Sequence, residues 1–166
     1  MRDYNRTVVA GCLVEDRGSG RVRMVPGVGP VAHYELGAID ATRVVRGLSK
    51  AAEVMRAVGA PRVILPIAGA PAPIETERAL RLLSEPIAAR TLRPFTVHAM
   101  GTARMSEHPD GGVVSSFGEM HGVPGVFVAD ASILPGPVGV NPMETIVALA
   151  LRNSERLIGE RARFGI

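Results

Sequence analysis

The feature that most constrains the fold is a pair of strongly apolar segments near the C-terminal end of the sequence. Val126 to Ala129 is a compact apolar run that predicts a strand. After the loop PGPVGVNP, apolar residues at helical spacing predict a final helix, with a face formed by Met143, Ile146, Val147, Ala150, Leu151, Leu157 and Ile158. Ala148 and Leu149 widen this face, so the helix is expected to pack between other layers. One antiparallel meander with two helices supplies too few partners, which indicates that a covering layer is missing.

The first part of the sequence predicts a small antiparallel sheet followed by a helix. Residues 7–15, 20–25 and 31–36 have the apolar content and turn spacing of a three-stranded meander. From Asp40 onward, apolar residues recur at helical spacing. Asp40 can cap the start of this helix, and Gly59 is expected to end it.

The middle of the sequence alternates short elements with loops. Val63 to Leu65 predicts a short buried strand, and a broken second helix is expected around Glu75 to Leu83. Residues 94–100 predict a further strand with His98 near its end, and residues 102–125 are expected to be irregular. Together these elements predict an α+β fold.

Composition and charge narrow the class of protein. With 46% hydrophobic and 21% charged residues, the chain is expected to be globular and soluble rather than disordered. The net charge of +3 is spread along the sequence without a basic cluster, so nucleic-acid binding has little support. Cys12 is the only cysteine, which excludes an internal disulfide. Because the sequence has no recognisable signal peptide and no membrane-spanning apolar run, a cytoplasmic location is expected.

Two patterns have plainer interpretations than their letters suggest. Gly27 to Ala32 reads G-x-G-x-x-A, as in dinucleotide-binding loops, yet Pro30 and a strand-like sequence follow where a helix is required. A hairpin turn is the stronger interpretation. His98, His108 and His121 lack the spacing of a zinc site, so surface histidines are favoured over metal ligands and no metal is expected.

His98 and Asn141 form the last candidate pair, and the sequence VFVADAS lies between them. An imidazole at the end of a strand can accept a proton near neutral pH, and an amide just before a helix can donate a hydrogen bond to an oxyanion. Each residue also fits a simpler role, His98 as a hydrogen-bonded strand terminus and Asn141 as a helix N-cap. Spacing alone leaves the catalytic and the structural interpretation open.

Three stretches in this order, HAMGTARM, GVVSSFGEMHGVPGVFVADASILP and GVNPMETIVALALRNSERLI, closely resemble the C-terminal signature of the glucose-methanol-choline (GMC) family of FAD-dependent oxidoreductases. The resemblance covers His98 to about Ile158, and it implies that the antiparallel sheet with flanking helices is part of the family's substrate domain. The strand at 126–129 and the final helix would complete a separate FAD-binding domain. Residues 1–100 are then a partial substrate-binding domain, and residues 101–166 are the signature segment that returns to the FAD-binding domain.

The resemblance implies catalytic roles for two residues. His98 matches the active-site histidine beside the flavin, which takes the hydroxyl proton as hydride leaves the alcohol carbon for flavin N5. Asn141 matches the second catalytic position, where a histidine or asparagine hydrogen-bonds the substrate oxygen. A neutral amide can make that hydrogen bond at any pH.

The resemblance also assigns two segments to FAD. Asp130 and Ala131 match the segment that touches the FAD diphosphate and ribityl region. Asn141, Pro142 and Met143 match the turn that lies against the flavin ring. A helix that starts after this turn offers unpaired N–H groups to the negative charge of the reduced ring.

The family's N-terminal Rossmann unit, with its glycine fingerprint and ribose-binding acid, does not occur in these 166 residues. The resemblance therefore implies the C-terminal part of an FAD-dependent alcohol oxidoreductase, inactive without an FAD-binding part. Its substrate would be a small-molecule alcohol, and its partner a complementary FAD-binding chain or a missing N-terminal region. Two alternatives stay open, a non-catalytic interaction module with the same fold and a remnant fragment. The identity of the alcohol and of the electron acceptor is left open as well.

Overall fold

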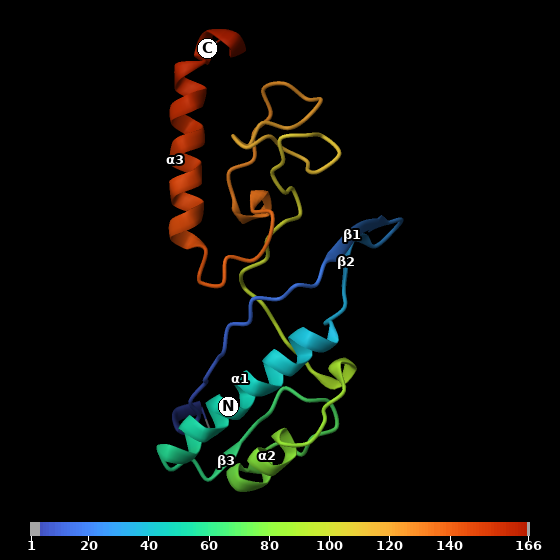
Figure 1. Cartoon of the computed structure of the whole chain (residues 1–166), viewed down its shortest axis with the longest axis vertical. Coiled ribbons are helices and arrows are strands. Elements are labelled where there is room, and N and C mark those ends of the chain that lie inside the picture. The colour runs from blue at the N-terminus through green and yellow to red at the C-terminus, as the bar shows by residue number, and fades with distance from the viewer. Residues whose placement is uncertain (1–3, 166) are drawn as a thin grey trace. The chain divides into compact units, whose positions relative to one another are not determined.

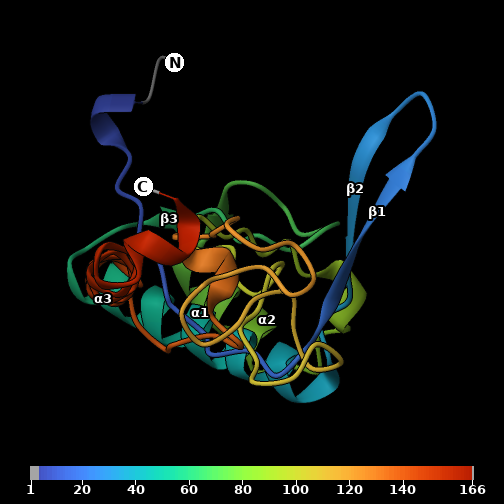
Figure 2. The same cartoon turned by 90° about the horizontal axis from the view of Figure 1, so that it is seen from above.

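A computed structural model describes residues 4–165 and contains three α-helices, two small antiparallel sheets and four short 3-10 helices within that range (Figures 1 and 2). The 3-10 helices are η1 (Tyr4–Arg6), η2 (Ala89–Thr91), η3 (Ala131–Ile133) and η4 (Arg161–Phe164). The chain divides into two compact units. The first unit combines the described part of residues 1–20 with residues 34–95, and the second combines residues 21–33 with the described part of residues 96–166. This architecture confirms the predicted α+β class.

The first two strands form a hairpin, made by β1 (Gly20–Val25) and β2 (Gly29–Tyr34). Gly27 and Gly29 have φ of 76° and 97°, a conformation that favours glycine, and the Val28 amide donates to the Val25 carbonyl at 3.0 Å. The G-x-G-x-x-A sequence is therefore a hairpin turn, as predicted.

The strand predicted at residues 7–15, the first of the three-stranded meander, is wrong. These residues form no strand, because the N-terminal segment is held against α1 (Ala38–Ala57) instead of against another strand. The Arg43 guanidinium donates to the Glu15 carbonyl at 2.9 Å. Cys12 lies over Gly47, where an added Cβ would be 2.6 Å from its sulfur.

Helix α1 ends as predicted and begins differently. Gly59 follows its last turn with φ of 81°. The N-cap is Gly37 without a side-chain cap, so the prediction that Asp40 caps the helix is wrong. Asp40 is the third residue of the helix and is only 2% exposed. Its carboxylate accepts the Arg17 amide at 2.9 Å and an Arg43 N–H at 3.4 Å. Its charge is thus used to bind the N-terminal segment.

The core of the first unit lies between α1 and α2 (Thr76–Leu83), which confirms the predicted second helix. The strands β3 (Arg62–Val63) and β4 (Ile74–Glu75) pair antiparallel beside α2. The strand predicted at 63–65 is therefore shorter and one residue earlier. The buried core side chains are Ala52, Leu65, Ile74, Ala79 and Leu83.

Between the β1–β2 hairpin and its final helix, the second unit has little regular structure. Residues 102–125 are irregular as predicted, and the strand predicted at 94–100 does not form. The strand predicted at 126–129 is also wrong, because this segment pairs only through an isolated bridge between Phe127 and Glu119. Backbone bonds on that side join Val126 to Met120 at 2.8 Å and Val128 to Gly118 at 2.9 Å. A regular strand needs a continuous series of backbone hydrogen bonds to a neighbouring strand, and residues 118–120 provide only this short pairing.

The final helix is α3 (Met143–Gly159), as the apolar periodicity predicts. One face carries the buried Asn153, together with Arg156 and Leu157, toward residues 115–119. The opposite face has exposed apolar side chains, named here the outer stripe: Met143 (71% exposed), Val147 (53%), Leu151 (60%) and Ile158 (63%). Within residues 4–165, no helix combines the length and the apolar character needed to cross a membrane.

Candidate active site

His98 is half-buried and lies in an irregular, largely exposed stretch of the second unit. Its backbone amide donates to Thr96 Oγ1 at 3.0 Å, which closes a tight local turn. Within residues 4–165 its imidazole makes no hydrogen bond. Because neither a strand nor a side-chain partner is present there, the interpretation of His98 as a hydrogen-bonded strand terminus is wrong, and both ring nitrogens are open to a ligand.

Asn141 lies in the exposed loop that leads into α3. The N-cap of α3 is Pro142, whose carbonyl accepts the Ile146 amide at 2.8 Å, and no side chain caps the helix. The interpretation of Asn141 as the N-cap is therefore wrong. Within the described residues its carboxamide has no hydrogen-bond partner, so its N–H groups are free to donate.

The start of α3 leaves backbone donors unpaired. The first intrahelical bond begins at Ile146, so the amides of Met143, Glu144 and Thr145 have no partner within residues 4–165. These amides lie at the positive end of the helix dipole, which favours negative charge by about 0.3–1 kcal/mol at an exposed site. Pro142 is buried, which anchors the turn before α3. Met143, the next residue, is 71% exposed and stays accessible.

Asp130 and Ala131 begin the 3-10 helix η3. Asp130 is its N-cap and accepts the Ser132 amide at 2.7 Å. Hydrogen bonds from the Ser132 side chain and then from its amide lower the pKa of Asp130, which keeps this exposed carboxyl ionised near neutral pH. The Ala131 amide has no partner in the described part of the chain, so this turn offers one free donor.

Backbone hydrogen bonds join the segment that follows His98 to the segment that precedes Asn141. The Ala103 amide donates to the Ser132 carbonyl at 3.0 Å, and the Met105 amide donates to the Ile133 carbonyl at 2.7 Å. Gly101 lies so close to Leu134 that an added Cβ would be 3.4 Å from its carbonyl oxygen. These bonds hold the two segments side by side. The approach of the His98 and Asn141 side chains to one another stays a prediction.

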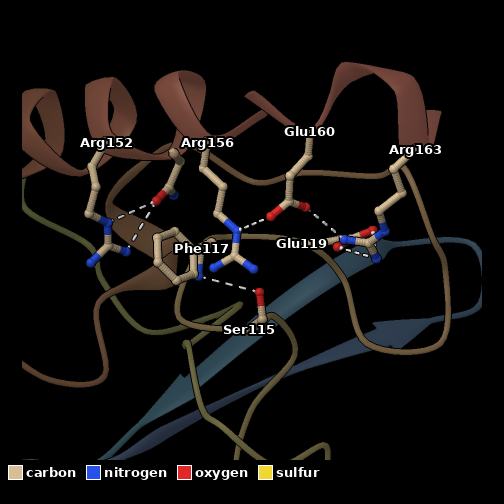
Figure 3. A network of polar contacts seen from close by, with 8 residues as sticks. Ser115, Phe117, Glu119, Arg152, Arg156, Glu160 and Arg163 are labelled. Carbon is tan, nitrogen blue, oxygen red and sulfur yellow. Dashed lines mark hydrogen bonds and ion pairs between the residues drawn. The ribbon is translucent and has the colours of Figure 1, made fainter. Parts of the chain in front are cut away.

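Sequence reasoning missed a group of residues that fixes α3 (Figure 3). The guanidinium carbons of Arg152 and Arg156 lie 4.6 and 3.8 Å from the centre of the Phe117 ring, and Arg152 also donates to the Ser116 carbonyl. Arg156 pairs with Glu160 at 2.8 Å. A signal was present, because two arginines one turn apart on a helix can clasp an aromatic ring.

The same network continues beyond the end of α3 into η4. Arg163 of η4 joins Glu160 at 3.1 Å and Glu119 at 3.0 Å, so the segment 115–119 contacts α3 through Arg152 and η4 through Arg163 (Figure 3). A pocket of about 20 Å³ beside Phe117 and Asn153 is large enough for only about one water molecule. This pocket therefore holds neither a flavin nor an alcohol.

The histidines do not form a metal site. Within residues 4–165, no three His, Cys, Asp or Glu side chains come together as possible ligands. His121 Nε2 lies 3.1 Å from the Ser106 carbonyl, and His108 is exposed.

Comparisons with known proteins find relatives along most of the chain. The profile of the family described as GMC oxidoreductase matches residues 17–150. An uncharacterised GMC-type oxidoreductase of Sinorhizobium fredii is 32% identical over 152 residues, which are 91% of this chain and 30% of that protein. A long-chain-alcohol oxidase of Arabidopsis thaliana is 29% identical over 159 residues, 90% of this chain and 21% of that protein.

A solved structure shares the fold. Pyridoxine 4-oxidase from Mesorbium loti matches with a TM-score of 0.52 and 24% sequence identity, over 86% of this chain and 28% of that chain. The chain thus spans 30% or less of the length of each of these three proteins.

Proposed function

Because this chain belongs to the GMC oxidoreductase family, we propose that it is the C-terminal part of an FAD-dependent enzyme that oxidises an alcohol to an aldehyde or ketone. The observation that carries the proposal is the family match over residues 17–150, which includes the His98 segment and the turn before α3. The backbone bonds between residues 103–105 and 132–133 support it, because they join the segments on which the two catalytic residues lie.

The donors of this chain fit the flavin ring chemically. Reduction places negative charge on the ring, and the free amides of Met143, Glu144 and Thr145, together with the Asn141 carboxamide before them, offer N–H donors to that charge. Asp130 would shape the turn near the diphosphate, since its carboxylate is occupied by Ser132, and the free amide of Ala131 would face the phosphate oxygens.

In the proposed reaction the alcohol carbon loses a hydride and the alcohol oxygen loses a proton. FAD, when bound, supplies the acceptor for the hydride at N5. A ring nitrogen of His98 accepts the proton, for which its unpaired imidazole is suited. Asn141 Nδ2 donates to the substrate oxygen, which stabilises the negative charge that develops there as the proton leaves.

The remainder of the enzyme would come from polypeptide outside these 166 residues. In the proposed assembly, residues 1–100 contribute part of a substrate-binding domain, and residues 101–166 return to an FAD-binding domain. The outer stripe of α3 and the unpaired backbone edge of residues 126–129 support this proposal, since an exposed apolar helix face and unpaired backbone groups are both stabilised by a covering layer.

The test is flavin reduction in the protein assembled with its FAD-binding polypeptide. We expect flavin absorbance after assembly and loss of that absorbance when an alcohol is added without oxygen. His98→Ala should assemble equally well and reduce its flavin about 10²-fold or more slowly. If the interaction-module alternative holds, no alcohol in a broad panel will bleach the flavin and His98→Ala will change nothing.

A further inference from the structure

The segment around His98 has few polar side chains. Between Pro94 and Met100 the polar side chains are those of Thr96 and His98. The Thr96 hydroxyl already accepts the His98 amide. The imidazole is therefore the one side chain of this stretch that makes no hydrogen bond among the described residues and could accept a proton from a substrate.

The segment that leads to Asn141 has the same character. From Ala131 to Met143 the polar side chains are those of Ser132 and Asn141, and no residue is charged. Ser132 is hydrogen-bonded to Asp130. The Asn141 carboxamide is thus the single polar side chain without a partner in this described stretch.

An exposed valine directly precedes each of the two residues. Val97 is 79% exposed and Val140 is 62% exposed. A polyol brings additional hydroxyl groups next to the reacting one, and those groups lose their bonds to water unless the site replaces them. Valine side chains replace none of these bonds, whereas they gain from contact with hydrocarbon.

We propose that Val97 and Val140 form apolar walls beside the reacting carbon, so that the site selects uncharged alcohols with a hydrocarbon chain over polyols. The inference rests on the proposed function, because it places the substrate between His98 and Asn141. It goes further in naming two specificity residues and the class of alcohol.

The test uses the assembled flavoprotein and two probes, 1-hexanol and glycerol, with the rate of anaerobic flavin reduction as readout. The unaltered protein should be reduced by 1-hexanol at least about tenfold more efficiently than by glycerol. Val97→Asn and Val140→Asn should each lower the 1-hexanol to glycerol ratio by about tenfold, within the range that one apolar contact contributes to selectivity. Val123→Asn is the matched control, since Val123 is 45% exposed and adjoins neither site residue, and it should keep the ratio.

The outcomes separate this inference from the proposed function. If neither probe nor any other alcohol bleaches the flavin, the proposed function fails and the inference fails with it. If the flavin is bleached but glycerol is preferred, or if both valine variants keep the ratio of the unaltered protein, the function stands and the inference is overturned. Loss of flavin content in both valine variants would overturn it too, because the valines would then be buried against the other polypeptide.

Discussion

Gly118 occupies a position in the second unit that no other residue fits. Its φ is 80°, and an added Cβ would lie 2.6 Å from the Val128 carbonyl and 2.8 Å from Asn153 Nδ2. Gly118→Ala should lower the free energy of unfolding by about 2–4 kcal/mol, the sum of a left-handed conformation and a backbone clash. Gly122→Ala is the control, because Gly122 has φ of 78° with nothing within 4 Å of an added Cβ. It should cost only about 1–2 kcal/mol in urea unfolding, and equal losses would contradict the packing argument.

Tyr34 provides a pH-dependent test of the first unit. Removal of its hydroxyl from water, and then its 2.6 Å hydrogen bond to Asp16, raise the pKa of Tyr34 well above its usual range. The folded protein thus keeps the phenol protonated when the unfolded chain has lost the proton. This contribution to stability is complete below about pH 10 and is lost as pH rises through the folded pKa.

An absorbance titration at alkaline pH should therefore show a late phase of tyrosinate signal from Tyr34. Tyr34 should ionise above the ordinary tyrosine range, and Asp16→Asn should bring its titration down because the negative neighbour is removed. Tyr34→Phe should abolish the late phase. A single phase near the ordinary pKa in the unaltered protein would refute the contact.

At the level of elements, Phe117 is the contact through which α3 is held to the irregular segment beside it. Phe117→Leu keeps most of the apolar area and removes the attraction of Arg152 and Arg156 to the ring, so α3 should lose about 1–2 kcal/mol of stability. Hydrogen exchange of the α3 amides measures this loss directly. Phe95→Leu is the matched control, because Phe95 is 87% exposed and should leave exchange unchanged.

The sequence allowed the helices to be predicted and misled about the strands, for one physical reason. An α-helix satisfies its backbone internally, so apolar periodicity was sufficient for α1, α2 and α3. A strand needs a neighbour, and residues 7–15, 94–100 and 126–129 have strand-like side chains without a ladder to join. The hairpin β1–β2 was predictable because its turn chemistry is local.

The same distinction between local and long-range information applies to the candidate site. The resemblance singled out His98 and Asn141 by their letters, and the structure added that neither side chain has a partner among the described residues. The Asp40 contacts could not be predicted, because they depend on which distant segment meets α1. The one-turn spacing of Arg152 and Arg156 was a signal for an aromatic contact, but it did not identify Phe117 as the partner.

At the scale of the whole molecule, three features fit the proposed additional layer of polypeptide. The outer stripe leaves four large apolar side chains in water, residues 126–129 are paired along one edge, and the first turn of α3 has free amides. Burying such a surface is favourable by a free energy of roughly 25 cal/mol for each Å² of apolar area removed from water. The relatives, more than three times longer than this chain, have the length to supply such a layer.

Leu151→Lys tests that layer without disturbing the chain itself. Because Leu151 is 60% exposed, the substitution should change the free energy of unfolding of the isolated chain by less than about 0.5 kcal/mol. In the assembled protein the same lysine would have to be buried in an apolar interface, so assembly with the FAD-binding polypeptide should weaken by about tenfold or more. Titration calorimetry measures the affinity, and flavin content measures how much assembled flavoprotein forms.

Ala57→Lys, which adds the same charge at an exposed position of α1, is the control and should leave both unchanged. If Leu151→Lys assembles as tightly as this control, the outer stripe faces solvent in the assembled protein and the proposed layer does not cover it.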